Sequence, residues 1–333
     1  MRTVVAGLGA MGRRHVQAAR SLGWEIVACS DPRPESFESA GDLLGDAEKC
    51  ATYKDALSRG ADVAIVASTA PSHIDLALEA LQSGAPFVLV EKPLGVSVAE
   101  CQSLQTATEA GRSRVAVNHP MRFMPVYAEP IKWVTDPRQG GFCSMTVICG
   151  SGGLAMIGSH FIEAFRVTSG SRLAKIQAWL DGEGLPNPRG QEFEDVTGQI
   201  RGTTEMGHRL NIDMGRDQGH GIKIIYAARN GVAVVDLLSG VFETAGRQEA
   251  DLDLPTTRYG TVADRNLTQL PPSDPIAASA AMLQALVSGQ PVPTVQDGVD
   301  IVACLAAMYH SHESGQSVDV GTEHDPARRF AWA

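Results

Sequence analysis

The stretch that decides the fold is Thr3-Val-Val-Ala-Gly7-Leu-Gly9-Ala-Met-Gly12. A short apolar run leads directly into a G-x-G-x-x-G turn, and a helix-compatible segment follows from Arg13 to Leu22. The next apolar run, Glu25 to Cys29, is followed by the acid Asp31. Strand, glycine turn, helix, strand and acid, in this order, are what a dinucleotide-binding unit requires.

Each residue of the turn has a physical task in such a unit. Gly7 allows the tight turn, Gly9 lets the backbone approach a pyrophosphate, and Gly12 lets the helix pack closely on the strand. The amides of Ala10 and Met11 open a helix N-terminus, whose dipole favours the anionic phosphates. A glycine turn also joins strands to helices without any ligand, so the strand before it and the acid after it carry the interpretation.

Asp31 bears on the choice of cofactor. Its carboxylate would accept hydrogen bonds from the adenosine ribose hydroxyls and repel a 2′-phosphate, which favours NAD. Arg33 lies two residues further on and would offset part of that repulsion, so NADP stays open. The alternative interpretation of Asp31 is a turn residue at a strand end, before Pro32.

The composition limits the class of protein. A chain of 333 residues, 44% of them hydrophobic, is long enough for one to three domains with a sizeable core. The formal net charge of −10, with no basic block, argues against nucleic acid or an anionic membrane surface as the main partner. Strand residues begin at Thr3 without a leader-like segment before them, and apolar stretches such as Ile301 to Tyr309 are about half as long as a membrane span. We therefore expect a soluble, cytoplasmic protein.

Neither a metal centre nor a disulfide is expected. The cysteines form no C-x-x-C pair and lie mostly in apolar runs, which is typical of buried thiols. His310 and His312, on a predicted helix, are spaced so that they lie on different helix faces.

Residues 1 to about 118 alternate short, continuous apolar runs with helical patterns, as buried parallel strands joined by helices do. We predict an α/β fold whose first domain, residues 1–120, is a doubly wound Rossmann sheet with a cofactor site at its strand C-termini. A capping box at Ser97 and Glu100 marks the last helix of this domain. The strands are expected at Thr3–Ala6, Glu25–Cys29, Val63–Ala67, Phe87–Val90 and Arg114–Val117, and the helices near Arg13–Leu22, Tyr53–Arg59, Ser72–Ser83 and Ala99–Ala110.

Residues 121–333 are expected to form an α+β domain on an open, mostly antiparallel sheet, with the C-terminal helix and tail packing back on the first domain. Strands and turns dominate from Lys175 to Glu243, including a hairpin with a turn at Asn230-Gly231. The segment Leu252–Asp274, rich in Pro, Thr and Asp, is predicted as a surface loop. A strand is expected at Gly140–Gly150, and helices at Gly158–Val167, Asp274–Ser288 and Gln296–Ser314.

A second motif ends the fourth apolar run and reads Val88-Leu-Val-Glu91-Lys92-Pro93-Leu94. It places Lys92 at the C-terminal edge of the sheet, where the cofactor is expected, and Pro93 keeps Lys92 out of helical geometry. The Lys92–Pro93 bond is also a candidate for the cis form. On its own, Lys92 would be interpreted as a surface lysine after a strand.

With these motifs the chain resembles the glucose-fructose oxidoreductase and inositol 2-dehydrogenase (Gfo/Idh/MocA) family of NAD(P)-dependent sugar and polyol oxidoreductases. The resemblance covers nearly the whole chain and is specific to the family, not to a substrate. It implies a Rossmann domain plus a second domain, whose sheet often forms an oligomer interface with one face and helps to form the site with the other. The motifs are Gly7–His15, Ala67–His73, Glu91–Pro93, Val117–Pro125, Gly158–Glu163 and an ending with a helix and short strand, Ser311–Val320.

The resemblance assigns roles to individual residues. Lys92 corresponds to the lysine that bonds the reacting hydroxyl beside the nicotinamide, and His160 to the histidine that assists it in proton transfer; these two are the catalytic candidates. Arg122 corresponds to an arginine that either contacts the substrate or fixes the inter-domain loop. The cofactor candidates are Gly7, Gly9, Ala10, Met11, Gly12, Asp31, Ser68, Thr69, Pro71, His73, Glu91, Lys92 and Asn118, and the substrate candidates are Lys92, Asn118, Arg122, Met156, His160 and Glu163.

One position departs from the family. Its polyol dehydrogenases often place an aspartate four residues before the site histidine, where this chain has Met156. The carboxylate that would orient and charge the imidazole is therefore missing. Glu163, one turn after His160, is a candidate substitute, or else a solvated helix residue. Met156 indicates a less polar site, or a substrate whose own group supplies the contact.

Oxidation of a secondary alcohol needs a hydride acceptor and a base for the hydroxyl proton. A free lysine, with a pKa near ~10.4, is a poor base at neutral pH, but burial beside a positive nicotinamide lowers that pKa. We therefore expect an NAD(P)-dependent oxidoreductase acting on a CH-OH group of a sugar, sugar derivative or cyclitol, with NAD as cofactor, assembled as a homodimer or homotetramer through the second-domain sheet. The alternatives are a keto-sugar or sugar-nucleotide reductase of a biosynthetic pathway, and a non-catalytic dinucleotide-binding regulator.

Overall fold

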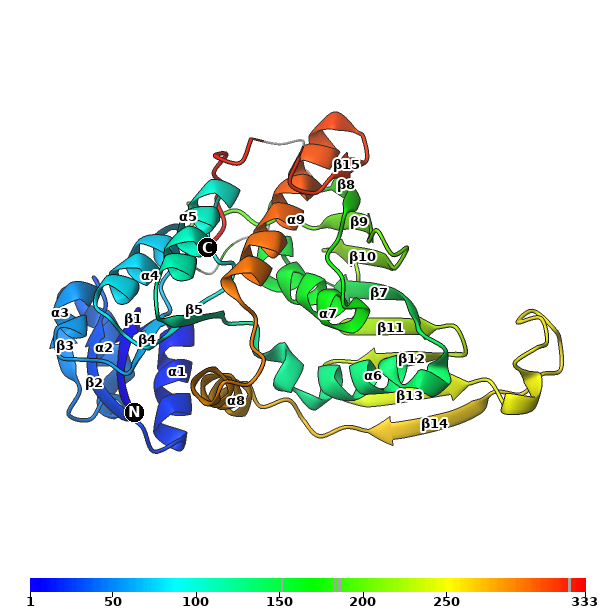
Figure 1. Cartoon of the computed structure of the whole chain (residues 1–333), viewed down its shortest axis with the longest axis horizontal. Helices are drawn as coiled ribbons and strands as arrows, with labels where there is room; N and C mark the ends of the chain where they lie inside the picture. Colours follow the sequence, from blue (N-terminus) through cyan, green and yellow to red (C-terminus); the bar gives the residue numbers. More distant parts are fainter. Residues whose placement is uncertain (151, 182–183, 185–186, 188, 323–324) are drawn as a thin grey trace.

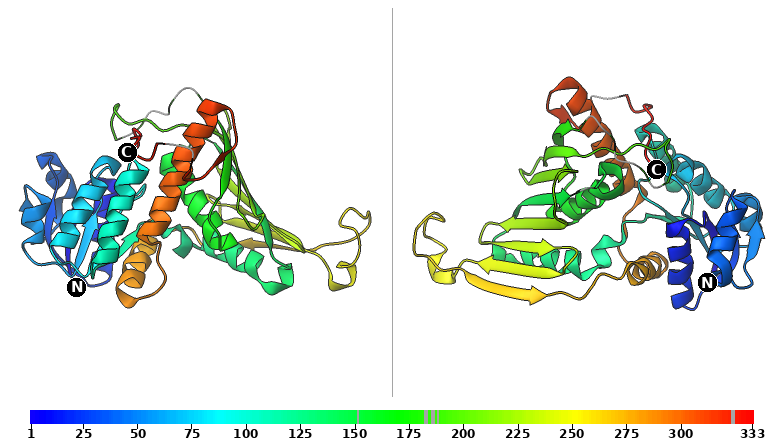
Figure 2. Two further views of the ribbon diagram at one scale, coloured as in Figure 1. Left: turned by 45° about the horizontal axis from the view of Figure 1, so that its top comes forward. Right: turned by 180° about the vertical axis from the view of Figure 1, so that it is seen from behind.

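The protein consists of two sheets with helices between and around them (Figure 1). The computed structural model describes residues 1–150, 152–181, 184, 187, 189–322 and 325–333. The N-terminal part is a parallel sheet covered by helices on both faces, and the larger second sheet carries its helices on the face toward the first part (Figures 1 and 2).

The first sheet is parallel throughout, with the strand order β3-β2-β1-β4-β5-β6. The order reverses between β1 and β4, so a crevice opens at the C-terminal edge of these two strands. The strands are continuous apolar runs because both of their faces are buried, as Val4, Ile65 and Leu89 are. They are β1 (Arg2–Ala6), β2 (Glu25–Ser30), β3 (Glu48–Cys50), β4 (Val63–Val66), β5 (Phe87–Val90) and β6 (Arg114–Val117).

Helices connect these strands. Ser97 begins α5 with the expected capping box, in which its hydroxyl accepts from the Glu100 amide and the Glu100 carboxylate accepts from the Ser97 amide. The helices are α1 (Ala10–Ser21), α2 (Pro34–Ala40), α3 (Tyr53–Leu57), α4 (His73–Gln82) and α5 (Val98–Ala110). The predicted doubly wound Rossmann sheet is therefore confirmed.

The second sheet has the order β14-β13-β12-β11-β7-β10-β9-β8-β15 in the part of the chain that the structure describes. Its pairs are antiparallel except for β7 with β10, so the expectation of a mostly antiparallel sheet is confirmed. The strands are β7 (Phe142–Gly150), β8 (Lys175–Leu180), β9 (Gly198–Thr203), β10 (Arg209–Gly215), β11 (Ile222–Ala228), β12 (Gly231–Asp236), β13 (Val241–Gly246), β14 (Asp264–Gln269) and β15 (Val318–Asp319).

The helices of the second part lie between the two sheets. α6 (Pro125–Thr135) packs on β11 and β12, α7 (Ser159–Ser169) on β7, and α9 (Val295–Ser314) on β8. α8 (Pro275–Ser288) packs against α1, and α9 also packs against α5. The last residues run along α5, where the Ala99 amide donates to Pro326 and the Phe330 amide to Val96. The domain boundary at residue 120 stays a prediction.

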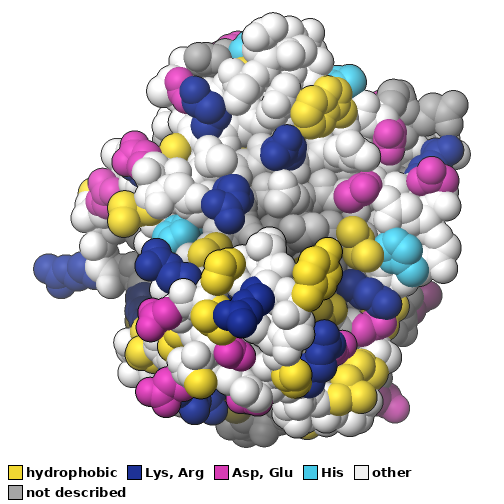
Figure 3. Space-filling view, turned by 90° about the vertical axis from the view of Figure 1, so that its right-hand side faces the viewer, with side chains coloured by type: hydrophobic (Ala, Val, Ile, Leu, Met, Phe, Trp, Pro, Cys, Tyr) yellow, Lys and Arg dark blue, Asp and Glu magenta, His cyan; other side chains and the backbone are white. Residues whose placement is uncertain are grey.

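One expectation about the secondary structure is wrong. The segment Leu252–Asp274 is not all loop, because it contains β14, which pairs with β13 and forms the edge of the sheet. This edge strand is exposed on both faces, so it shows no apolar alternation by which the sequence would have revealed it. The residues before it, 247–263, form an arm that projects from the molecule (Figure 1). Figure 3 views the molecule from this end, where hydrophobic side chains form separate patches among charged ones.

Two further observations restrict the possibilities. Among the helices of the described residues, none combines the length and apolar character needed to cross a membrane. The same residues bring no three His, Cys, Asp or Glu side chains together in a way that would hold a metal ion.

Candidate functional site

The three glycines between β1 and α1 have different surroundings. A Cβ on Gly7, whose φ is +86°, would lie 2.6 Å from the carbonyl oxygen of Ala67, and one on Gly12 would lie 1.8 Å from that of Gly7. Close backbone packing therefore demands glycine at both positions. A Cβ on Gly9 would meet no atom within 4 Å. The backbone at Gly9 thus borders open space, as the approach of a pyrophosphate requires.

The start of α1 is prepared for an anion. No side chain caps the helix at Gly9, and no acidic residue lies in its first turn. The first amides, including those of Ala10 and Met11, are therefore available together with the positive end of the helix dipole. Open space at Gly9 and uncapped amides beside it fit the phosphates of a dinucleotide.

Asp31 directly follows β2 and contacts the glycine turn at Leu8. Its carboxylate accepts hydrogen bonds from the Leu8 amide at 2.8 Å and the Arg33 amide at 3.0 Å, and it pairs with the Arg33 guanidinium at 3.2 Å. Although burial raises the pKa of Asp31, the hydrogen bonds from Arg33 and Leu8 lower it below its usual value. The group is therefore an anion at neutral pH, and 60% of the Arg33 side chain is exposed, so that the arginine is free to move aside.

The loop after β4 carries Ser68, Thr69, Pro71 and His73. His73 is buried, and its ring nitrogens lie 2.9 Å from the carbonyl oxygen of Pro93 and 3.2 Å from that of Ser68. The bond between Lys92 and Pro93 is cis. His73 thus connects the loop after β4 to the turn after β5, while the cofactor-binding role expected for this loop stays a prediction.

A buried polar cluster fixes the residue before the lysine. Glu91 Oε1 lies 2.7 Å from His15 Nε2 and accepts from Asn118 Nδ2 at 2.7 Å, and its second oxygen accepts from the Lys92 amide at 3.2 Å. Burial raises the pKa of Glu91, but His15, Lys92 and Asn118 together lower it to about 2. Glu91 and Asn118 therefore anchor the ends of β5 and β6 to α1, where His15 lies.

Lys92 follows β5 as a buried amine. Its Nζ donates to the carbonyl oxygen of Met156 at 2.7 Å. Burial lowers the pKa of Lys92 from 10.5 to about 8, with Arg189 lowering it further and the carboxylates of Glu91 and Asp195 raising it. A lysine with this pKa exchanges its proton near neutral pH, as an acid-base group must.

Asp195 is a residue of this site that the sequence did not reveal. It lies before β9 and is buried, and its two carboxylate oxygens accept from the amides of Ala155 at 2.9 Å and Met156 at 2.8 Å. Burial raises the pKa of Asp195, with Lys92 among the groups that lower it. Asp195 thus holds the π-helical turn Leu154–Gly158, whose Met156 carbonyl meets Lys92. No sequence motif marks Asp195, so only the folding of the chain brings it to this site.

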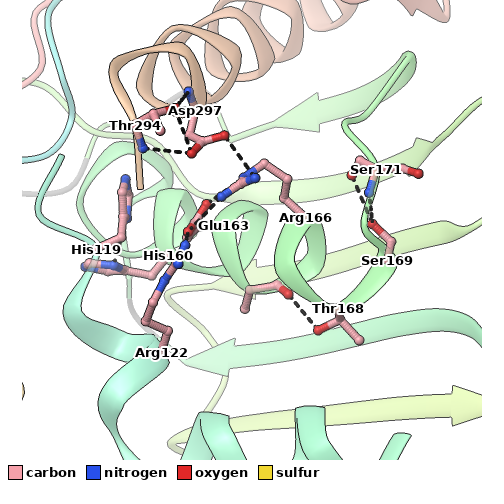
Figure 4. A network of polar contacts seen from close by, with 11 residues as sticks. His119, Arg122, His160, Glu163, Arg166, Thr168, Ser169, Ser171, Thr294 and Asp297 are labelled. Atoms are coloured by element: carbon pink, nitrogen blue, oxygen red, sulfur yellow. Dashed lines mark hydrogen bonds and ion pairs between the residues drawn. The ribbon is translucent and has the colours of Figure 1, made fainter. Parts of the chain in front are cut away.

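His160 lies in the first turn of α7, beside a second histidine that the sequence had not singled out. Its Nδ1 is 3.2 Å from Nδ1 of His119, and the two rings meet edge to face, with centroids 5.1 Å apart (Figure 4). Burial lowers the pKa of His119 to about 4 and, with the neighbouring Lys92, that of His160 well below its ordinary value. Both rings are therefore neutral at pH 7.

The expectation that Glu163 substitutes as the partner of His160 is wrong. Glu163 forms ion pairs with Arg122 and, at 2.8 Å, with Arg166, which also reaches Asp297 at the start of α9 (Figure 4). Burial raises the pKa of Glu163, but Arg166 and the other cations lower it below its usual value. The Glu163 carboxylate is thus paired with two arginines. The pair with Arg122 connects the segment after β6 to α7, which agrees with the alternative in which Arg122 fixes the inter-domain loop.

The fold thus joins the sequence candidates into one region. The Gly7–Gly12 turn, Asp31 and the loop at Ser68 lie at the carboxyl edge of a parallel sheet, and Lys92 and Asn118 follow its strands β5 and β6. Together these features define a Rossmann domain of the dinucleotide-binding class, and helix α7 of the second part adds His160.

Comparison with known proteins agrees with that class. Residues 1–119 match the Gfo/Idh/MocA model, described as an oxidoreductase family with an NAD-binding Rossmann fold. Over these residues, about a third of its length, the chain is similar to this family of oxidoreductases.

Curated relatives match part of the chain. An inositol 2-dehydrogenase of Acidiphilium cryptum is 33% identical over 128 residues, which cover 37% of this chain and 38% of that protein. The myo-inositol dehydrogenase Hyg17 of Streptomyces leeuwenhoekii is 26% identical over 129 residues, or 39% of each chain. The matched stretch therefore spans about two fifths of the length of these relatives.

Solved structures extend the likeness to the whole fold. An oxidoreductase from Agrobacterium radiobacter in complex with NAD⁺, L-tartaric acid and magnesium has a TM-score of 0.81 at 17% identity, covering 97% of this chain and 99% of that one. A levoglucosan dehydrogenase in complex with NADH and levoglucosan has a TM-score of 0.80 at 18% identity, covering 97% and 100%. At these identities the likeness establishes the two-part fold.

Proposed function

We propose that the protein is an NAD-dependent oxidoreductase that transfers a hydride between nicotinamide and a secondary alcohol or ketone of a sugar, sugar derivative or cyclitol. The observation that carries the proposal is Lys92, a buried amine with a pKa of about 8 at the carboxyl edge of the Rossmann sheet. Burying an amine is costly, and a surface role for Lys92 is excluded by its position. Its place beside the expected nicotinamide supports an acid-base role.

The chain supplies the binding groups and the proton transfer. Bound NAD would supply the hydride acceptor or donor. The space at Gly9 and the amides of Ala10 and Met11 would hold the pyrophosphate, and Asp31 would accept from the ribose hydroxyls once Arg33 moves aside. In oxidation, neutral Lys92 takes the hydroxyl proton of the substrate; in reduction, protonated Lys92 returns it.

The substrate would lie against Lys92 and His160. Among the substrate candidates, Asn118 already donates to Glu91, and Arg122 and Glu163 already pair with each other. The names of the relatives, which are inositol dehydrogenases, and of the levoglucosan dehydrogenase support a sugar or cyclitol as the substrate class. Because the match with the family model ends at residue 119, we assign the choice within this class to the second part of the chain.

We also propose a homodimer or homotetramer through the second sheet. In the part of the chain that the structure describes, no other helix or strand covers the face turned away from the helices (Figure 2). Half-buried apolar side chains lie on neighbouring strands of the sheet, namely Ile148 on β7, Ile225 on β11, and Val232 and Val234 on β12. A contiguous apolar patch of this kind is typical of an interface.

The test is reduction of NAD on a panel of sugars and cyclitols, followed at the absorbance band of reduced nicotinamide. Turnover on a member of the panel, lost in Lys92→Ala and kept in Lys132→Ala, would support the proposal; Lys132 is an exposed lysine on α6 that serves as the matched control. Tight NAD binding without oxidation or reduction of any panel member would instead favour the alternative of a non-catalytic dinucleotide-binding regulator. Normal turnover of Lys92→Ala would exclude the proposed chemistry.

A further inference from the structure

The imidazole of His160 needs an orienting partner. In the family that the chain resembles, the expected partner is an aspartate one turn earlier, and Met156 occupies that place. The Met156 backbone is engaged by Asp195 through its amide and by Lys92 through its carbonyl. The next carboxylate on the helix, Glu163, is paired with two arginines. Neither residue therefore replaces the missing carboxylate.

His119 occupies the position that such a partner requires. It follows β6 directly, and its amide donates to Val117 at 2.8 Å, so its backbone is held at the end of the Rossmann sheet. Its side chain is 1% exposed and that of His160 is 7% exposed, so water does not compete for the contact between them. The charged groups that act on His119 are Lys92, Glu91, Glu163 and Arg122.

A contact between two Nδ1 atoms has a specific consequence. Two neutral imidazoles can share one proton there, because one ring must donate and the other must accept. If His160 carries the Nδ1 proton, its Nε2 is an acceptor; if His119 carries that proton, Nε2 of His160 is a donor. With Nδ1 engaged, Nε2 is the nitrogen of His160 that remains to meet a substrate hydroxyl.

We propose that His119 is the positioning residue of His160: it fixes the ring and its tautomer in place of the aspartate that the chain lacks. The inference rests on the proposed function for its catalytic meaning, but the tautomer of His160 exists without any substrate. A neutral partner also differs chemically from an aspartate, because it leaves His160 uncharged instead of stabilising an imidazolium.

The decisive measurement is long-range ¹H–¹⁵N NMR of the whole protein with ¹⁵N-labelled histidine at pH 7, with the His160 signals assigned through His160→Gln. We expect a single neutral tautomer of His160, which becomes a mixture or switches in His119→Leu. His119→Asn, whose amide can still bond Nδ1, should retain a single tautomer. The control is His220→Leu, which removes an exposed imidazole elsewhere and should change nothing.

Kinetics give a second readout. With the substrate found in the panel above, kcat of His119→Leu should fall about 10- to 100-fold, by analogy with the loss of a partner that orients a metal-bound histidine, while the Kd of NAD stays unchanged. Met156→Asp supplies a carboxylate one turn before His160. In a protein with this substitution, the fall in kcat caused by His119→Leu should be smaller. An unchanged tautomer of His160 in His119→Leu, or two tautomers in the unmodified protein, would overturn the inference. If the panel gives no turnover, the proposed function fails, but the NMR result still decides whether His119 positions His160.

Discussion

Replacing Lys92 by methionine should make the protein more stable while it removes turnover. The pKa of Lys92 is lowered from 10.5 to about 8 in the folded protein. Below pH 8 the amine is protonated in both the folded and the unfolded chain, so the folded state carries the full cost of the buried charge. Between pH 8 and 10.5 the unfolded chain holds more protons, and stability rises with pH until the cost disappears.

The size of the effect follows from the two pKa values. The difference between 10.5 and about 8 corresponds to about 3 kcal/mol. Methionine also loses the hydrogen bond from Nζ to the Met156 carbonyl, which is worth about 1 kcal/mol. We therefore expect Lys92→Met to raise the free energy of unfolding by about 2 kcal/mol at pH 7 and by close to zero at pH 10.

Urea unfolding followed by circular dichroism at pH 7 and pH 10 measures this difference. Lys132→Met is the matched control, because this exposed lysine on α6 should change the free energy of unfolding little at either pH. The reasoning would be refuted if Lys92→Met were no more stable than the unmodified protein at pH 7, or if its gain were the same at both pH values.

Three further predictions concern the cofactor, the acid-base group and the assembly. Asp31→Ala should weaken NAD binding about tenfold, as expected for lost hydrogen bonds to a charged group, and narrow the preference over NADP; equal Kd values for both cofactors in the unmodified protein would contradict this. Asp195→Asn removes a charge that raises the pKa of Lys92, so the rise of alcohol oxidation with pH should move to lower pH; an unmoved pH profile would speak against it. Light scattering at micromolar concentration should give a dimer or tetramer mass, not that of one 35.3 kDa chain.

The sequence by itself determined most of the first half of the protein, although it did not reveal α2 or the short strand β3. Apolar runs that are buried on both faces, the Gly7–Gly12 turn and the acid Asp31 are local signals, since each depends on residues close together along the chain. The parallel sheet, the capping box at Ser97 and the hairpin at Asn230 follow from such signals. The sequence did not reveal the edge strand β14, because a strand exposed on both faces shows no periodic pattern of apolar residues.

Only the tertiary structure decided which side chains of the site contact each other. The contact of His119 with His160 joins the end of β6 to α7, and Asp195 approaches Lys92 from the segment before β9. Glu163 turned to two arginines instead of His160, because Arg122 from another segment lies within reach. Partners of this kind depend on how helices and sheets pack across long chain distances, and a buried polar group must bond whichever partner that packing brings to it.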